Sequence, residues 1–153
     1  MGFKITFYIT SEVMRPGTVS GDAECCMVAE KQGKVVAEKV VRKSFEVTTR
    51  NQSYMEMLLA ALEELNKLAE GAKLEVICDY KWMVSELLAM EERAKRDFCR
   101  KDGKKLKNEA LWEKIHEALS HYKWWCGYME LSDMKEEAWN GAKVKEKGRE
   151  GGN

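Results

Sequence analysis

Two carboxylate residues, Glu56 and Asp79, lie within or beside apolar runs of the sequence, where charged residues are uncommon. Glu56 is the only charged residue in the run Met55–Leu62, and Asp79 directly follows the apolar run Leu74–Cys78. A carboxylate in such a segment either reaches solvent or has a function, because burying an unpaired charge costs free energy. In open α/β sheets, ligands gather at the carboxyl ends of strands, which is where Asp79 is expected. The alternative for Asp79 is to cap the helix that follows it.

A basic segment, residues 93–107, predicts contact with phosphates. It contains eight Lys and Arg against two Asp, a net charge of +6. Its basic residues are Arg93, Lys95, Arg96, Arg100, Lys101, Lys104, Lys105 and Lys107. Phe98 interrupts the segment and Trp112 follows it, and basic residues with nearby aromatics are typical of nucleic-acid binding. The alternative is a solvated charged face.

The elements that must position these residues predict an α/β protein with a mixed sheet. We expect strands over 5–10, 24–30, 35–47, 74–78 and 122–128, and helices over 52–70, 80–90, 108–121 and 133–143. The short turn Lys31–Lys34, with Gly33 free to take a positive φ, makes the first strands an antiparallel meander. The helices between later strands imply parallel pairing through right-handed crossovers. The first strand should therefore be central, beside 74–78, with 35–47 at the edge.

The composition indicates one folded domain. The chain has 153 residues, of which 44% are hydrophobic and 34% charged, and this excludes global disorder. We expect a domain over residues 1–143 and a charged, Gly-rich, frayed tail over 144–153. No apolar run approaches the ~20 residues of a membrane span. Five cysteines, with no signal peptide visible, predict reduced thiols in a cytoplasmic protein.

Four motifs in this order resemble type I ribonuclease H, the family that cuts RNA in RNA–DNA hybrids. The turn Thr48-Thr49-Arg50-Asn51 resembles the one before the family's first helix, and Met55–Ala61 resembles its helix glutamate motif. Val76–Trp82 resembles the family's fourth-strand motif, and Lys105–Trp112 resembles the end of its basic protrusion. The resemblance implies a five-stranded mixed sheet flanked by helices, and a site where four carboxylates hold two divalent metal ions.

The chain departs from that pattern at the metal ligands. By resemblance, Thr10 takes the place of the first aspartate and Asn140 that of the last, on the C-terminal helix. Two extra residues also separate the Thr-Thr turn from Glu56. Glu56 and Asp79 are thus the remnant carboxylates, and we expect them to bind Mg²⁺ or Mn²⁺ weakly, because carboxylate count sets much of the affinity for hard cations.

Displaced carboxylates could rebuild the site. Glu12 lies two residues after Thr10, on the same face if the strand continues, and Glu137 lies one helical turn before Asn140. The alternative is that Glu12 is a loop residue and that Glu136 caps the C-terminal helix.

The leading functional hypothesis is a catalytically inactive protein that binds an RNA–DNA hybrid or structured RNA. The basic segment would contact phosphates, with polar contacts from Thr49 and Asn51. The second hypothesis is an active, divergent metal-dependent ribonuclease H that uses Glu56, Asp79 and Glu12 or Glu137. The third is a protein-interaction module that keeps the fold as a scaffold, since fold does not guarantee function.

Overall fold

The computed structural model describes residues 3–15, 17–65, 71–98 and 108–134. Its strands are β1 (Lys4–Ser11), β2 (Val19–Lys31), β3 (Lys34–Thr48), β4 (Lys73–Cys78) and β5 (Lys123–Tyr128). Its helices are α1 (Arg50–Leu65), α2 (Lys81–Leu88), α3 (Met90–Lys95), α4 (Glu109–Leu119) and α5 (Leu131–Met134). No helix within these ranges is long and apolar enough to cross a membrane.

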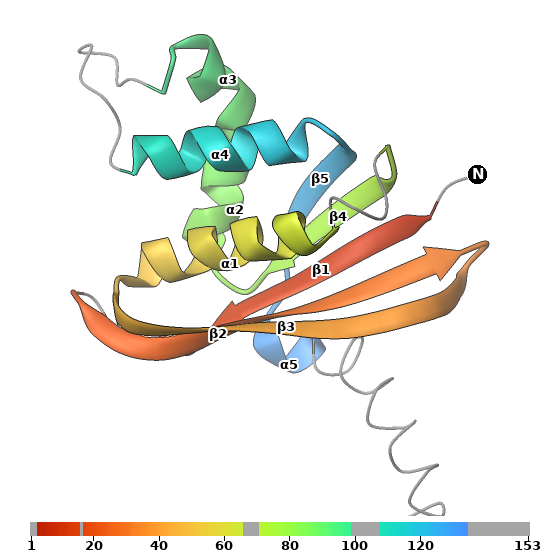
Figure 1. The fold of residues 1–153 in the computed structure, drawn as a ribbon, viewed down its shortest axis with the longest axis horizontal. Coiled ribbons are helices and arrows are strands. Elements are labelled where there is room, and N and C mark those ends of the chain that lie inside the picture. Colours follow the sequence, from red (N-terminus) through yellow and green to blue (C-terminus); the bar gives the residue numbers. More distant parts are fainter. Residues whose placement is uncertain (1–2, 16, 66–70, 99–107, 135–153) are drawn as a thin grey trace, which may run out of the picture.

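The five strands form one mixed sheet in the order β3-β2-β1-β4-β5 (Figure 1). β1 pairs antiparallel with β2 and β2 with β3, whereas β4 is parallel to both β1 and β5. The turn between β2 and β3 has positive φ at both central residues, 55° at Gln32 and 79° at Gly33, as a type I′ hairpin turn requires. The predicted meander, the central β1, the edge position of β3 and the parallel β1–β4 pair are confirmed.

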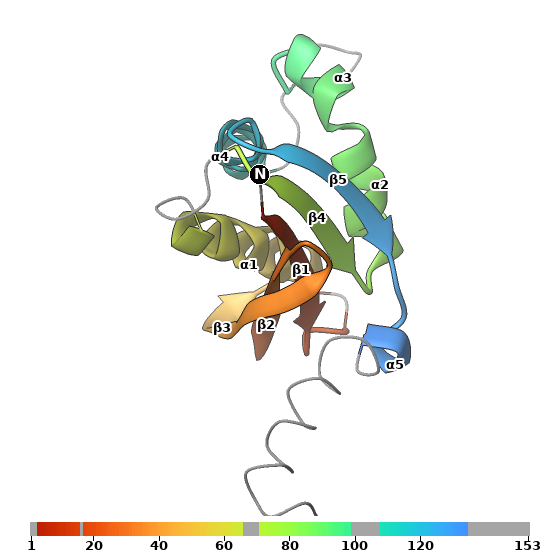
Figure 2. The ribbon, with the colours of Figure 1, turned by 90° about the vertical axis from the view of Figure 1, so that its right-hand side faces the viewer.

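One face of the sheet carries the main core. Phe7 and Ile9 of β1 are buried against α1, which presents Leu58 and Leu62, and α4 adds Ile115. Helices α1 and α4 lie side by side over the sheet, and α5 lies away from them (Figure 2). The alternation of β1 therefore sends odd-numbered side chains toward α1 and even-numbered ones, including Thr10, to the opposite face.

Several boundaries differ from the sequence prediction. β2 begins at Val19 rather than Glu24, because its antiparallel register with β3 continues to the pair Val19–Thr48. The helix expected over 80–90 is divided at Ala89 into α2 and α3. The last helix begins at Leu131. The remainder of the predicted 133–143 helix and the 144–153 tail lie outside the described residues.

Candidate functional site

Helix α1 begins directly after the Thr-Thr turn. The Thr49 hydroxyl oxygen accepts a hydrogen bond from the Gln52 backbone N–H at 3.2 Å, which is an N-cap. Because the helix starts at Arg50, the two residues counted as extra before Glu56 form part of its first turns. The capped start therefore decides which α1 side chain faces the strand ends.

That side chain is Tyr54. Its hydroxyl donates a hydrogen bond to Asp79 Oδ1 at 2.7 Å. Residues two apart on an α-helix point about 200° apart, so Glu56 faces away from Tyr54. Glu56 is half-buried on the outer side of α1, which it shares with the exposed Glu63. The structure thus brings Tyr54 to Asp79 and does not bring the two predicted remnant carboxylates together.

The carboxyl group of Asp79 is half-buried. Burial raises its pKa, while the hydrogen bond from Tyr54 and the charge of Arg50 act in the opposite direction. Burial raises the pKa of Tyr54 as well, and the adjacent Asp79 adds to that shift. Asp79 does not cap α2, whose N-cap residue, Tyr80, makes no side-chain cap hydrogen bond. The pair is therefore a neutral phenol donating to a carboxylate.

Thr10 and Glu12 share a pocket of about 530 Å³ with Asp79. Asp22, Glu24 and Arg42 also line it, and Arg42 Nε lies 3.1 Å from Glu24 Oε2. Next to Thr10 on β1, Ser11 points the other way, since its Oγ lies 2.7 Å from Ser53 Oγ on α1. Thr10, Glu12 and Asp79 therefore line one pocket, but β1 ends at Ser11, so Glu12 lies in the bend after the strand, as the loop alternative predicts.

The described residues do not fit a pair of divalent metals. Within the described ranges, no three His, Cys, Asp or Glu side chains are grouped so as to hold a metal ion. The Oδ1 atom of Asp79 is already engaged by Tyr54, and Mg²⁺ demands several oxygen ligands in near-octahedral geometry. Asn140 and Glu137 lie outside the described residues, so their roles stay predictions.

A second group of side chains lies beside the Tyr54–Asp79 pair. The guanidinium of Arg50 stacks on the Tyr80 ring, 3.9 Å from its centroid, and the Tyr80 hydroxyl donates to Asn51 Oδ1 at 2.6 Å. We call Arg50, Asn51 and Tyr80 the arginine–tyrosine patch. Within the described part of the chain, Arg50 Nε is buried and has no hydrogen-bond partner. The patch therefore holds the guanidinium in a fixed position against the face of an aromatic ring.

A series of aromatic rings packs next to this patch. Tyr80 lies 4.9 Å from Tyr54 and 5.5 Å from Trp82, measured between ring centroids, and Trp82 lies 6.1 Å from Trp112. Sequence reasoning missed Arg50, Tyr54 and Tyr80 as site residues. Their signal was local, since Arg50 stands in the Thr-Thr turn motif and Tyr80 directly follows Asp79.

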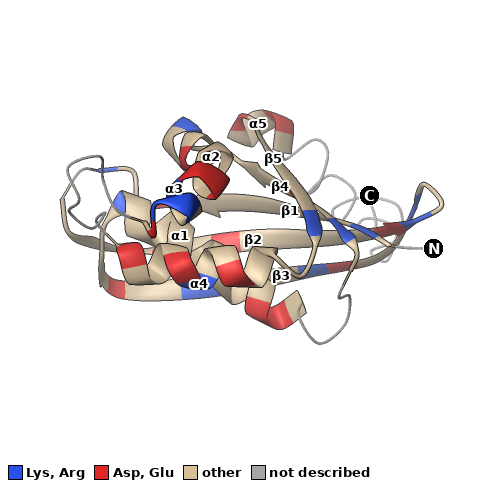
Figure 3. Cartoon of the chain, turned by 90° about the horizontal axis from the view of Figure 1, so that it is seen from above, with Lys and Arg blue, Asp and Glu red and all other residues tan. Residues whose placement is uncertain are grey.

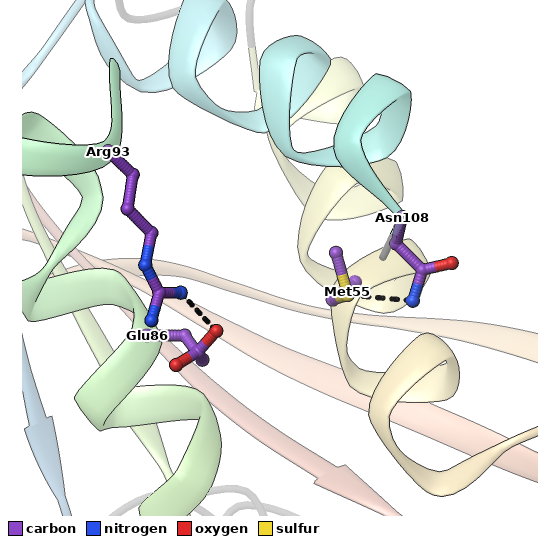
Figure 4. Close-up of polar contacts among 4 residues, drawn as sticks. All are labelled: Met55, Glu86, Arg93 and Asn108. Atoms are coloured by element: carbon purple, nitrogen blue, oxygen red, sulfur yellow. Dashed lines mark hydrogen bonds and ion pairs between the residues drawn. The ribbon is translucent and has the colours of Figure 1, made fainter. Parts of the chain in front are cut away.

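The described part of the basic segment is largely paired. Arg93 forms an ion pair with Glu86 of α2, as Figure 4 shows beside the contact between Asn108 and Met55. Arg96 lies 3.9 Å from Glu92, and Lys95 is exposed. The other predicted phosphate contacts, Arg100, Lys104, Lys105 and Lys107, lie outside the described residues.

Helix α4 presents the opposite charge. Seen from above, acidic turns follow one another along it (Figure 3), where Glu109, Glu113 and Glu117 recur at helical spacing. Carboxylates repel phosphates, so this row of glutamates does not itself favour contact with nucleic acid.

Comparison with known proteins identifies the fold. LC9-RNase H1, a type 1 RNase H with the type 2 active-site motif, matches with a TM-score of 0.73 and 17% identity, over 94% of this chain and 72% of that chain. The N-terminal RNase H domain of rv2228c from Mycobacterium tuberculosis matches with a TM-score of 0.62 and 16% identity, over 92% and 99% of the two chains. LC11-RNase H1, solved in complex with an RNA/DNA hybrid, gives 0.57 and 17%, over 91% and 99%.

These likenesses show that the chain has the ribonuclease H fold, as the sequence motifs predict. No protein-family model matches the chain, and no curated protein matches it. The roles of individual side chains therefore rest on the geometry described above.

Proposed function

We propose that this protein binds RNA–DNA hybrids and does not cleave them. The hydrogen bond from Tyr54 to Asp79 carries the proposal, because it places a neutral phenol where a metal-dependent site would need a second anionic ligand. Thr10, which lines the pocket beside Asp79, is also neutral. The proposal places the protein in the cytoplasm, where its cysteines stay reduced.

The proposed contacts are to the nucleic-acid backbone. An A-form-like duplex offers little readable sequence in its deep groove, so recognition rests on shape, 2′-hydroxyls and phosphates. Arg50 supplies an oriented cation beside Asn51, and both lie at the start of α1. The Thr49 hydroxyl oxygen accepts the capping hydrogen bond from Gln52 N–H, and its hydroxyl hydrogen can donate to a phosphate. Lys104, Lys105 and Lys107 would add charge from the basic segment.

Salt dependence of binding tests the contacts. The affinity for a short RNA–DNA hybrid should fall with salt, with a slope set by the number of phosphates contacted. Changing Lys104, Lys105 and Lys107 together to Ala should flatten that slope. Binding that is absent at low salt, or indifferent to these changes, would favour the protein-interaction module instead.

Cleavage tests the proposed inactivity. We expect no cut product from a hybrid incubated with the unmodified protein and Mg²⁺. The second candidate, an active divergent enzyme, would use Asp79 with Glu12 or Glu137. Asp79 and Glu12 line one pocket with Thr10, and Glu137 lies outside the described residues. Cleavage in Mn²⁺ that disappears in Asp79→Asn would establish that candidate and end ours. Carry-over nuclease is controlled by preparing both proteins in parallel.

A further inference from the structure

The outer edge of β3 is long and open. β3 spans 15 residues, pairs with β2 on one side, and receives no backbone hydrogen bond on its other side from any described residue. Figure 1 shows it as the outermost strand of the sheet. Val40, at its middle, is 48% exposed. A long open edge is a template for pairing with another strand, and charges along it decide which pairings are permitted.

The middle of β3 is regular enough to pair as a straight strand. Its register with β2 runs without a shift from Ala37 to Phe45, and irregularities lie only beyond these residues. Two copies of this stretch meeting edge to edge about a two-fold axis must run antiparallel. Antiparallel partners are of the same hydrogen-bonding type, and types alternate along a strand. The axis must therefore pass through a residue that faces its own copy.

Charge excludes most positions for that axis. Centring the pair on Glu38, Lys39 or Arg42 makes each of these charged residues face its own copy. Centring it on Val41 opposes Lys39 to Lys43 twice. Like charges directly opposite one another destabilise a cross-strand pair. These registers are all penalised.

One central register is complementary. With the axis at Val40, Glu38 of each copy faces Arg42 of the other, so two opposite-charge pairs flank a Val40–Val40 contact. No like charges oppose one another between Ala37 and Lys43. Arg42 is well placed for this, because its side chain is 68% exposed while it holds Glu24 on the neighbouring strand. The charges then alternate across the joined sheets.

We propose that β3 is a homodimerisation edge, pairing with β3 of a second copy in the register centred on Val40. The joined strands make one continuous sheet from two ribonuclease H folds. β3 and β5 are the two opposite edge strands of the sheet. The inference does not depend on whether the proposed hybrid binding is correct.

Charge reversal tests the register. Sedimentation equilibrium of the unmodified protein should show a concentration-dependent dimer. Glu38→Arg alone, or Arg42→Glu alone, should weaken it at least about tenfold, because each replaces two opposite-charge pairs by like-charge pairs. An equimolar mixture of the two variants should recover the dimer, since one copy then supplies the cations and the other the carboxylates.

Lys43→Glu is the matched control. Lys43 faces Ala37 in the proposed register, so this change should leave the dimer intact, whereas it would strengthen a pair centred on Val41. Circular dichroism confirms that each variant is folded. A protein that stays monomeric up to about 1 mM, or single variants that dimerise as well as the parent, would overturn the proposal.

Discussion

The Tyr54–Asp79 pair and the arginine–tyrosine patch are neighbours with opposite chemistry. In the first, a phenol donates to a half-buried carboxyl group at 2.7 Å and occupies one of its two oxygens. In the second, Arg50 offers a cation stacked 3.9 Å from a ring centroid, with a buried Nε that no described residue satisfies. The difference is the basis of the proposal that this site contacts an anion rather than holding metal ions.

The strongest test of that contrast is to restore a carboxylate beside Asp79. Tyr54→Glu should lower the free energy of unfolding by about 3–5 kcal/mol without metal, because a buried aromatic is lost and a like charge is added. Mn²⁺ at about a hundred times its Kd should return ~2.7 kcal/mol, as judged by thermal unfolding with and without the ion.

Glu56→Gln is the control for this test. Glu56 lies on the outer side of α1, so its removal should change stability by less than about 0.5 kcal/mol and leave any response to Mn²⁺ unaltered. Equal stabilisation of the unmodified protein and Tyr54→Glu by Mn²⁺ would show that the pair does not exclude metal.

Tyr54→Phe isolates the hydroxyl. This variant keeps the ring and its contact with Tyr80 but removes the hydrogen bond to Asp79. A hydrogen bond to a charged group contributes about 1.5–3 kcal/mol, so urea unfolding should reveal a loss of that size. No change in the midpoint would mean that solvent replaces the phenol at Asp79.

Arg50→Ala addresses the patch. Losing an oriented guanidinium should lower hybrid affinity about tenfold, or ~1.4 kcal/mol, in fluorescence anisotropy. Arg50→Lys should give an intermediate loss, because lysine keeps the charge without the planar stacking group. Arg15→Ala removes an exposed charge from the loop before β2 and should have little effect. If Arg15→Ala and Arg50→Ala lower the affinity for the hybrid equally, Arg50 contributes only its charge and the geometry of the patch does not matter.

Asp79→Asn should have the smallest effect, and that effect should depend on pH. Burial raises the folded-state pKa of Asp79, so folding is more favourable when this group is protonated than when it is ionised. That contribution is present at low pH and is lost as pH rises from the unfolded pKa through the folded one. The amide that replaces the carboxyl does not titrate, so the variant should gain stability relative to the parent as pH rises across this window. Thermal unfolding across the acid range measures it, and an opposite slope would contradict the stated environment of Asp79.

The strand order was predictable because local signals agreed with one another. The hairpin turn at Gln32–Gly33 and the helix between β3 and β4 leave few topologies for the sheet. The site was less accessible, because motif identity and helix phase disagreed. Glu56 matches the family's helix glutamate motif through the identity of the residues around it. The Thr49 cap, however, sets where the helix begins, and from that start Tyr54 rather than Glu56 points toward Asp79.

The ion pair formed by Arg93 of the basic segment also could not be predicted from the sequence. The sequence shows Arg93 at the start of a charged run, but its partner, Glu86, lies on the preceding helix across the break at Ala89. The sequence alone does not show that these two side chains meet across that break. A count of charges therefore overstates how many cations the segment offers to phosphates.

The row of aromatic rings beneath the arginine–tyrosine patch gives the protein a built-in optical reporter. Excitation energy absorbed by Tyr54 or Tyr80 can be transferred to Trp82, whose ring centroid lies 5.5 Å from that of Tyr80. Trp112, 6.1 Å further along, extends the same relay into the core. A nucleic acid seated on Arg50 would disturb the first ring of this series, so tryptophan emission would register occupancy without any attached label.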